Sequence, residues 1–160
     1  MHPTRIDLPA AVREKVTAIL NQHLADCTDL ALQAKQAHWN VKGSNFIGLH
    51  ELFDKIAALA REFQDELAER ATALGGIAEG TIQAVNKRSK LPTYPLDIVT
   101  WRDHVNKVAD GLAAFGKGVR AAIDEADKLG DKDTADLFTE ISREIDKQLW
   151  FVEAHVQSNE

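Results

Sequence analysis

Apolar residues recur at steps of three and four along almost the whole chain, and this period constrains the fold more than any other feature. Early in the chain the recurring positions are Val12, Val16, Ile19, Leu20, Leu24, Cys27, Leu30, Ala31 and Ala34. A helix that buries one side has this period, whereas a half-buried strand alternates every second residue. We therefore expect an all-α protein.

Capping residues and glycines divide this pattern into four long helices. The first helix is expected from Asp7, with Pro9 in its first turn, to about Trp39, and the second from Ser44 or Asn45 to about Leu74, before Gly75 and Gly76. The third is expected from Thr100, with Asp103 as its capping-box partner, to about Leu129, before Gly130. The fourth is expected to begin at Asp133 or Thr134. The connection between the second and third long helices carries Gly80, Pro92 and Pro95, and we expect one short helix in it, near 81–85.

Four helices joined by two short turns and one long connection indicate a four-helix bundle with a crossover, of which the ferritin-like topology is one example. The length of 160 residues suits a single domain, 1–160, with a short N-terminal tail, 1–7. No apolar run approaches the roughly 20 residues of a membrane helix. The N-terminus lacks a signal-peptide pattern, so we expect a cytoplasmic protein. The one cysteine, Cys27, is expected in the core.

Potential metal ligands gather on one flank of the second long helix. At 100° per residue from His50, the side chains of Asp54, Asp65 and Glu69 lie at about 40°, 60° and 100°, beside an apolar face. One chain cannot bring them to one ion, because Asp54 and Asp65 are about 16 Å apart along the axis and His50 and Glu69 about 28 Å. The helix therefore carries two half-sites, His50 with Asp54 and Asp65 with Glu69.

The two half-sites are spaced as a palindrome. The numbers of His50 and Glu69, and those of Asp54 and Asp65, add to the same value, 119. If two copies of the helix pack antiparallel about a two-fold axis near 59–60, each half-site meets the other half-site of the second copy.

A hairpin that turns near Ser44 also places His38 beside His50. The deduced site then has two histidines and an aspartate from one chain, with an aspartate and a glutamate from the other. Such an oxygen-rich ligand set without thiolate suits Fe, Mn or Zn. The net charge of −6 also suits a protein that attracts cations. A His/Asp pair four residues apart is equally ordinary on a solvated helix, so the residues alone leave a metal site and a plain surface both open.

Four segments resemble the Dps family, the mini-ferritins: "AKQAHWNVKGSNFIGLHELFD", "DELAERATALGGIAEGT", "YPLDI" and "DKQLWFVEAH". The resemblance spans roughly residues 8–157. It implies a ferritin-like fold, a homododecameric hollow shell, and a ferroxidase centre at the two-fold interface between subunits. The family's ligands fall on His38, His50, Asp54, Asp65 and Glu69.

The resemblance also implies a function. Family members oxidise Fe(II), with hydrogen peroxide as the preferred oxidant, store the ferric product in the shell and protect DNA from oxidative damage. The ligand set itself also suits zinc and manganese, so these ions are candidate competitors for the iron site. Trp39, next to His38, would be a nearby electron donor, and its alternative role is packing at the helix end. The family's acidic three-fold pores would fall on Asp127, Asp131 and Asp136, for which helix capping is the alternative role.

DNA binding is expected to be weak or absent. Many Dps proteins bind DNA through lysine-rich tails, but the segment before Asp7 offers only Arg5 and His2, and the C-terminus reads "VQSNE". A small basic cluster lies in the long connection, at Lys87, Arg88 and Lys90. The alternative function is therefore a nucleoid-associated protein that mainly coats DNA. The remaining histidines with a helical setting are expected to be structural or surface residues, namely His23, His104 and His155.

Overall fold

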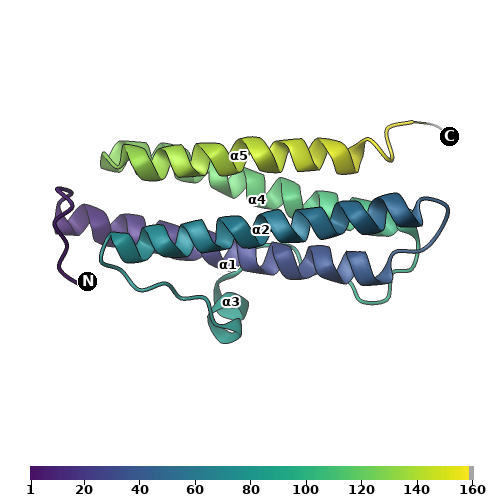
Figure 1. The fold of residues 1–160 in the computed structure, drawn as a ribbon, viewed down its shortest axis with the longest axis horizontal. Helices are drawn as coiled ribbons and strands as arrows, with labels where there is room; N and C mark the ends of the chain where they lie inside the picture. The colour runs from purple at the N-terminus through teal and green to yellow at the C-terminus, as the bar shows by residue number, and fades with distance from the viewer. Residues whose placement is uncertain (159–160) are drawn as a thin grey trace.

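Four long helices and one short helix form the chain in the computed structural model, which describes residues 1–158 (Figure 1). They are α1 (Ala10–Asn40), α2 (Phe46–Ala73), α3 (Ile82–Arg88), α4 (Trp101–Leu129) and α5 (Lys132–Glu153). Residues 1–158 contain no strand beyond an isolated bridge between Lys42 and Thr100. The expected all-α bundle, with a short helix in the crossover, is confirmed.

The bundle is built from two helical hairpins. α1 packs along α2 and α4 along α5, and the hairpins meet mainly through α1 and α4. α3 lies outside the bundle and contacts α1 (Figure 1). The apolar stripes of the long helices face inward, and the largest fully buried side chains include Phe53, Phe115 and Phe138. No helix within residues 1–158 is long and apolar enough to cross a membrane.

The first helix begins later than its sequence suggests. Asp7 was expected to cap it, but α1 starts at Ala10 and Pro9 occupies the N-cap position. The segment before Pro9 is held elsewhere, because Arg13 donates hydrogen bonds to the carbonyls of both Leu8 and Leu74. This contact ties the tail to the end of α2, so Asp7 cannot act as the cap.

The starts of α3, α4 and α5 follow their capping residues, whereas Asn45 at the start of α2 makes no side-chain capping hydrogen bond. Thr100 Oγ1 accepts a hydrogen bond from the Asp103 N–H at 3.1 Å, as a capping box predicts. The last helix starts at Lys132, slightly earlier than expected, because Asp131 supplies the cap. α3 is longer than the expected 81–85 and begins after Thr81, whose hydroxyl caps it.

A candidate metal centre on the first hairpin

Two stacked histidines lie where the α1–α2 hairpin turns. The imidazole rings of His38 and His50 are 3.7 Å apart between centroids and tilted by 22°. Their Nδ1 atoms bond across the hairpin in a reciprocal way: His38 Nδ1 lies 2.7 Å from the His50 carbonyl oxygen, and His50 Nδ1 lies 2.9 Å from the His38 carbonyl oxygen. The register that places these two residues side by side is confirmed.

The reciprocal bonds decide which nitrogen of each ring remains available. A carbonyl oxygen can only accept, so each Nδ1 must carry the proton. In the neutral ring Nε2 then keeps its lone pair, which is the state of a metal-binding imidazole held by a backbone carbonyl. Both rings are therefore oriented and in the correct tautomer without any ion present.

Asp54 lies in the same surface depression as His38 and His50. Its carboxylate is held by Lys35 of α1, whose Nζ lies 2.6 Å from Oδ1. The hydrogen bond from Lys35 lowers the pKa of Asp54, and the positive charge of Lys35 lowers this pKa further. Asp54 is thus an exposed, ionised carboxylate whose present counter-ion is a lysine.

Lys35 was not predicted as part of this site. Its Nζ also lies 5.6 Å from the centre of the Trp39 ring, and the Trp39 side chain is 65% exposed. The only sequence signal is spacing, because Lys35 precedes His38 by one helical turn on the same helix.

The second half-site lies further along α2. Asp65 and Glu69 are both exposed and lie beyond the depression at the hairpin turn. Within residues 1–158, no group of three or more His, Cys, Asp or Glu side chains is placed to hold a metal ion. The joining of the two half-sites between two chains stays a prediction.

Further carboxylates line the same helix near α5. Burial raises the pKa of Glu66, and the neighbouring charges of Glu140, Glu62 and Asp65 raise it further. These like charges lie close together near the second half-site, an arrangement that favours cations.

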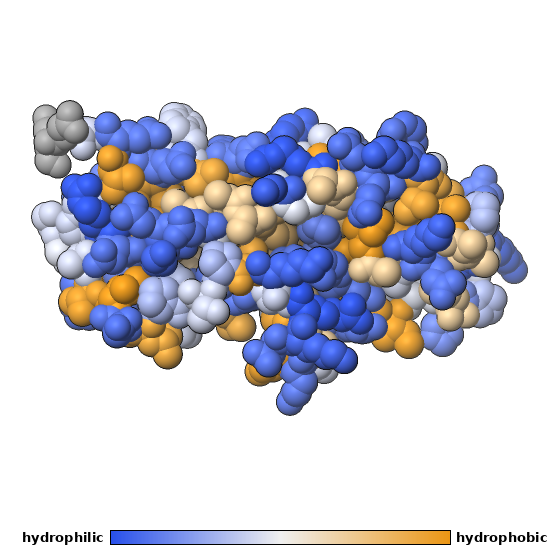
Figure 2. Space-filling view, turned by 180° about the vertical axis from the view of Figure 1, so that it is seen from behind, coloured by the Kyte–Doolittle hydropathy of each residue, from blue (hydrophilic) through white to orange (hydrophobic). Residues whose placement is uncertain are grey.

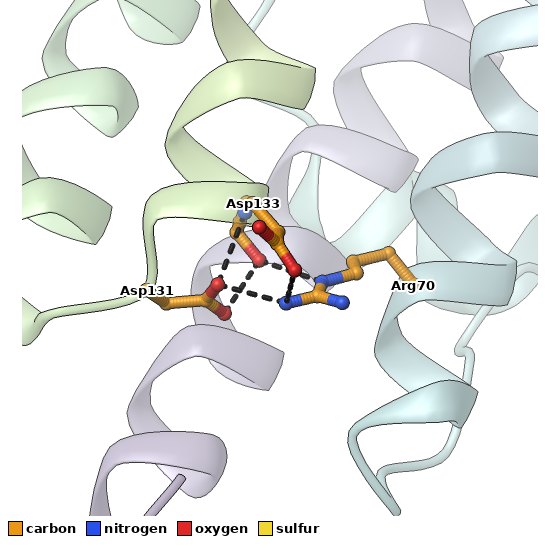
Figure 3. A network of polar contacts seen from close by, with 4 residues as sticks. Arg70, Asp131 and Asp133 are labelled. Atoms are coloured by element: carbon orange, nitrogen blue, oxygen red, sulfur yellow. Dashed lines mark hydrogen bonds and ion pairs between the residues drawn. The ribbon is translucent and has the colours of Figure 1, made fainter. Parts of the chain in front are cut away.

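The acidic residues around the α4–α5 turn differ in their surroundings. Asp131 is only 2% exposed; it caps α5 and accepts a hydrogen bond from Arg70 Nη2 at 2.8 Å (Figure 3). Asp133 lies on the open side of the same network, 4.0 Å from Arg70. Asp131 therefore lacks the exposure that a pore-lining carboxylate needs. Asp136 is exposed, and Asp127 pairs with Lys132.

The remaining histidines lie away from the depression. His23 packs on Phe138, His104 bonds to the Tyr94 hydroxyl, and His155 bonds to a carbonyl of its own helix end. Cys27 is fully buried, and its thiol donates to the Ala60 carbonyl at 3.0 Å. The expectation that Cys27 is a core residue is confirmed.

Comparison with known proteins supports what the bundle indicates. The ferritin-like domain family matches residues 17–160. The chain is 47% identical over 156 residues to the DNA protection during starvation protein of Agrobacterium fabrum, which covers 98% of this chain and 96% of that protein. A solved Dps structure from Mycobacterium smegmatis has a TM-score of 0.94 at 32% identity, covering 99% of this chain and 96% of that one.

A Dps protein of Vibrio cholerae O1, described as a member of a broad superfamily of ferritin-like diiron-carboxylate proteins, has a TM-score of 0.90 at 25% identity. The match covers 98% of each chain. The fold and the domain match define a ferritin-like protein. Within that class, the chain belongs to the Dps family.

Proposed function

We propose that the protein is an iron-detoxifying and iron-storing mini-ferritin whose ferroxidase centre is shared by two subunits. The main support is the His38–His50 pair, whose Nε2 atoms have no hydrogen-bond partner within residues 1–158 and which shares a surface depression with the ionised carboxylate of Asp54. Family membership adds the expectation of iron chemistry in general.

In the proposed centre, the half-site of one subunit meets Asp65 and Glu69 of the partner subunit. Antiparallel packing of two α2 helices brings the partner's Glu69 to His50 and the partner's Asp65 to Asp54. Near the axis, the small and exposed side chain of Ala58 would face Arg61 of the partner subunit. A small residue at this point permits a close approach of the two helices.

The ligand set fits the proposed chemistry. Two Fe(II) ions give one electron each to hydrogen peroxide, which takes up two protons and yields two water molecules and two Fe(III). Pairing the electrons avoids release of a hydroxyl radical. The carboxylates stabilise the higher charge of the ferric product. Trp39 would supply an electron when only one iron is present. Zinc or manganese would compete for the same ligands.

The wider assembly belongs to the same proposal. Twelve subunits would enclose a cavity in which the ferric product is stored, in the cytoplasm, and DNA would be protected because iron and peroxide are removed together. Asp136, with Asp127, would attract Fe(II) to a three-fold pore. Asp131 is left out of this pore because its carboxylate is buried and engaged.

Hybrid assemblies test whether the site is shared. His50→Ala and Asp65→Ala should each abolish fast Fe(II) oxidation by peroxide. In a mixed dimer one site carries both changes and the other carries neither, so remixed subunits should regain up to about half of the activity per hybrid dimer. Glu62→Ala, on the same helix but outside the ligand set, serves as the control. Proven subunit mixing without any recovery would contradict a shared site.

Coating of DNA is the second candidate function. The lysines of the connection, Lys87 and Lys90, are exposed, whereas Arg88 pairs with Glu79. The N-terminal tail also packs on the body of the protein, since the His2 N–H donates to the Gly75 carbonyl at 2.6 Å. These contacts leave few bases for phosphates. A gel shift that survives physiological salt would favour DNA coating over iron chemistry as the main role.

A further inference from the structure

A buried tyrosine is bonded to a buried histidine at the start of α4, apart from the ligands of the proposed metal centre. The hydroxyl of Tyr94, the one tyrosine of the chain, lies 2.6 Å from Nδ1 of His104. The surface that Figure 2 shows from behind mixes hydrophilic and apolar side chains, all in contact with water. Tyr94 is only 8% exposed and His104 only 1%, so the pair is largely shielded from water.

The hydrogen bond of this pair runs from the phenol to the imidazole. Within residues 1–158 the Tyr94 hydroxyl has no other hydrogen-bond partner, so the reverse direction would leave its proton buried without an acceptor. Nδ1 of His104 therefore accepts, and the proton of the neutral ring is on Nε2. That Nε2 atom is also buried and has no hydrogen-bond partner within the same residues. A buried polar atom of this kind is uncommon in a native structure.

Imidazole differs from the other acceptors that can hold a buried hydroxyl. A backbone carbonyl or a side-chain amide accepts a hydrogen bond but is not a base, whereas a neutral imidazole can take the proton completely. Burial raises the pKa of Tyr94 and lowers the pKa of His104, so both groups are neutral at ordinary pH. The proton therefore stays on the phenol until something changes the acidity of Tyr94.

Loss of one electron makes that change. A phenol that is oxidised by one electron becomes a strong acid, and its proton leaves with the electron when a base is in contact. The base in contact here is His104 Nδ1, 2.6 Å from the hydroxyl. The imidazolium so formed has no partner at Nε2 to pass a proton to. The proton therefore stays beside the phenoxyl oxygen and can return to it.

Two tryptophans lie between this pair and the proposed metal centre. Trp101 precedes His104 by one turn of α4. Its ring packs on the α1–α2 turn, because a Cβ atom built on Gly43 would lie 2.8 Å from Trp101 Cδ1. Trp39 lies four residues before Gly43, next to His38. Indole and phenol rings can both give up one electron, so oxidisable rings continue from the hairpin turn to Tyr94.

The charges beside these rings favour Tyr94 as the end point. Lys35 Nζ lies 5.6 Å from the centre of the Trp39 ring, and the guanidinium of Arg102 lies 4.8 Å from the centre of the Trp101 ring. A cation beside an indole disfavours a second positive charge on that ring. Tyr94 instead has a base beside it, and its radical is neutral once the proton has moved.

We propose that Tyr94 is a one-electron donor to oxidised tryptophan, with His104 as the acceptor of its proton. A small one-electron oxidant, itself reduced in the step, first removes an electron from an indole. The radical cation of Trp101 then takes one electron from Tyr94 and becomes neutral indole. The phenol O–H bond breaks and an N–H bond forms at His104 Nδ1, which leaves a neutral tyrosyl radical and an imidazolium. A reductant such as Fe(II), oxidised to Fe(III), restores the phenol, and the proton returns.

Pulse radiolysis of the assembled, iron-free protein with azide radicals tests the proposal, because these radicals remove one electron from indole. In the unaltered protein, the absorption of the indole radical should decay while that of the tyrosyl radical rises with the same rate constant. The rate constant should not depend on protein concentration and should be smaller in heavy water. Electron paramagnetic resonance of frozen samples should show a neutral tyrosyl radical, which can only be Tyr94.

Two pairs of variants assign the roles. His104→Gln keeps an acceptor for the hydroxyl but removes the base, so the conversion should slow by about tenfold or more. His23→Gln, at another buried histidine, is its matched control and should leave the rate unchanged. Trp101→Phe should slow the formation of the tyrosyl radical, whereas Trp150→Phe, at an exposed tryptophan of α5, should not.

Three outcomes would overturn the proposal. The first is the absence of a tyrosyl radical in the unaltered protein. The second is an unchanged rate in His104→Gln, which would show that the imidazole only holds the hydroxyl. The third is equal slowing by His104→Gln and His23→Gln, which would assign the effect to packing. Should His104→Gln fail to fold, the unaltered protein decides, since equal rates in light and heavy water overturn proton transfer. None of these measurements uses iron, so they are independent of the proposed ferroxidase centre.

Discussion

At the scale of single residues, His38 and His50 hold each other in place. Each Nδ1–H is fixed by the other residue's carbonyl, so neither ring can rotate without losing a hydrogen bond. Such preorganisation reduces what a metal ion must reorganise on binding. Asp54, the third proposed ligand of this half-site, is different because the Lys35 ammonium already forms an ion pair with one of its carboxylate oxygens.

The Lys35–Asp54 ion pair gives a prediction about metal affinity. A cation that binds Asp54 must displace the Lys35 ammonium, so Lys35→Met, which keeps the aliphatic stem, should strengthen Zn²⁺ binding. An increase of about two- to fivefold is the range expected of an exposed ion pair. Lys55→Met is the matched control, since Lys55 lines the same depression without an ion pair in the described residues. Titration calorimetry measures both variants. Equal or weaker zinc binding by Lys35→Met would contradict this reading.

Cys27 should be chemically inert in the folded protein. Burial raises the pKa of its thiol well above the ordinary value, and the charge of Asp26 raises it further. The thiolate is the reactive form, so an aromatic disulfide reagent at pH 8 should leave the native protein unlabelled and label about one thiol per chain in denaturant. Rapid labelling of the native protein would show that the thiol is accessible.

At the scale of the elements, Asp131 joins three helices. It caps α5, follows α4 and binds Arg70 of α2. Asp131→Ala removes the cap and leaves the half-buried Arg70 without its carboxylate, so the free energy of unfolding should fall by about 2–3 kcal/mol. Asp133→Ala, one residue inside α5 and exposed, should change it by less than about 0.5 kcal/mol. Urea denaturation measures the free energy of unfolding of both variants. Equal losses of stability would contradict a specific stabilising role for Asp131.

The long connection is anchored to α4 by Tyr94 and His104. The Tyr94 hydroxyl lies 2.6 Å from His104 Nδ1, and burial lowers the pKa of His104, with a smaller contribution from Lys42. The unfolded chain therefore binds a proton more readily than the folded one. The stability contributed by neutral His104 is present above its ordinary pKa of 6.5 and is lost as the pH falls towards the lowered value.

Thermal unfolding from pH 8 to pH 5 checks this assignment. Below about pH 6.5, the melting temperature of the unaltered protein should fall more steeply than that of His104→Gln. The glutamine side chain can accept a hydrogen bond from the Tyr94 hydroxyl but does not titrate. Identical pH profiles would show that His104 does not contribute to acid sensitivity.

At the scale of the whole molecule, periodicity and register predict more than local capping does. The apolar period predicts the four long helices, and hairpin register predicts the meeting of His38 and His50. The prediction that Asp7 caps the first helix was wrong, because hydrogen bonds from Arg13 hold the N-terminal tail elsewhere. The Lys35–Asp54 pair was not predicted either, since a partner on a neighbouring helix depends on how the helices pack.

The burial of Asp131 escaped prediction for a related reason, because Arg70 lies 61 positions away in the chain. Features made by two distant elements thus need the structure, whereas features made by one helix or one hairpin do not.

The last prediction concerns how iron reaches the interior of the proposed shell. Asp136→Asn removes an exposed carboxylate from the proposed three-fold pore and should slow initial Fe(II) uptake at limiting iron by about two- to threefold at low salt, with a smaller effect at high salt because of screening. Asp133→Asn is the matched control, since Asp133 is 86% exposed on the same turn but outside the proposed pore. Stopped-flow absorbance of ferric product measures the rate, and light scattering must show the same oligomeric mass for both variants. If the two variants slow uptake equally, the effect is one of general surface charge and Asp136 does not line a pore.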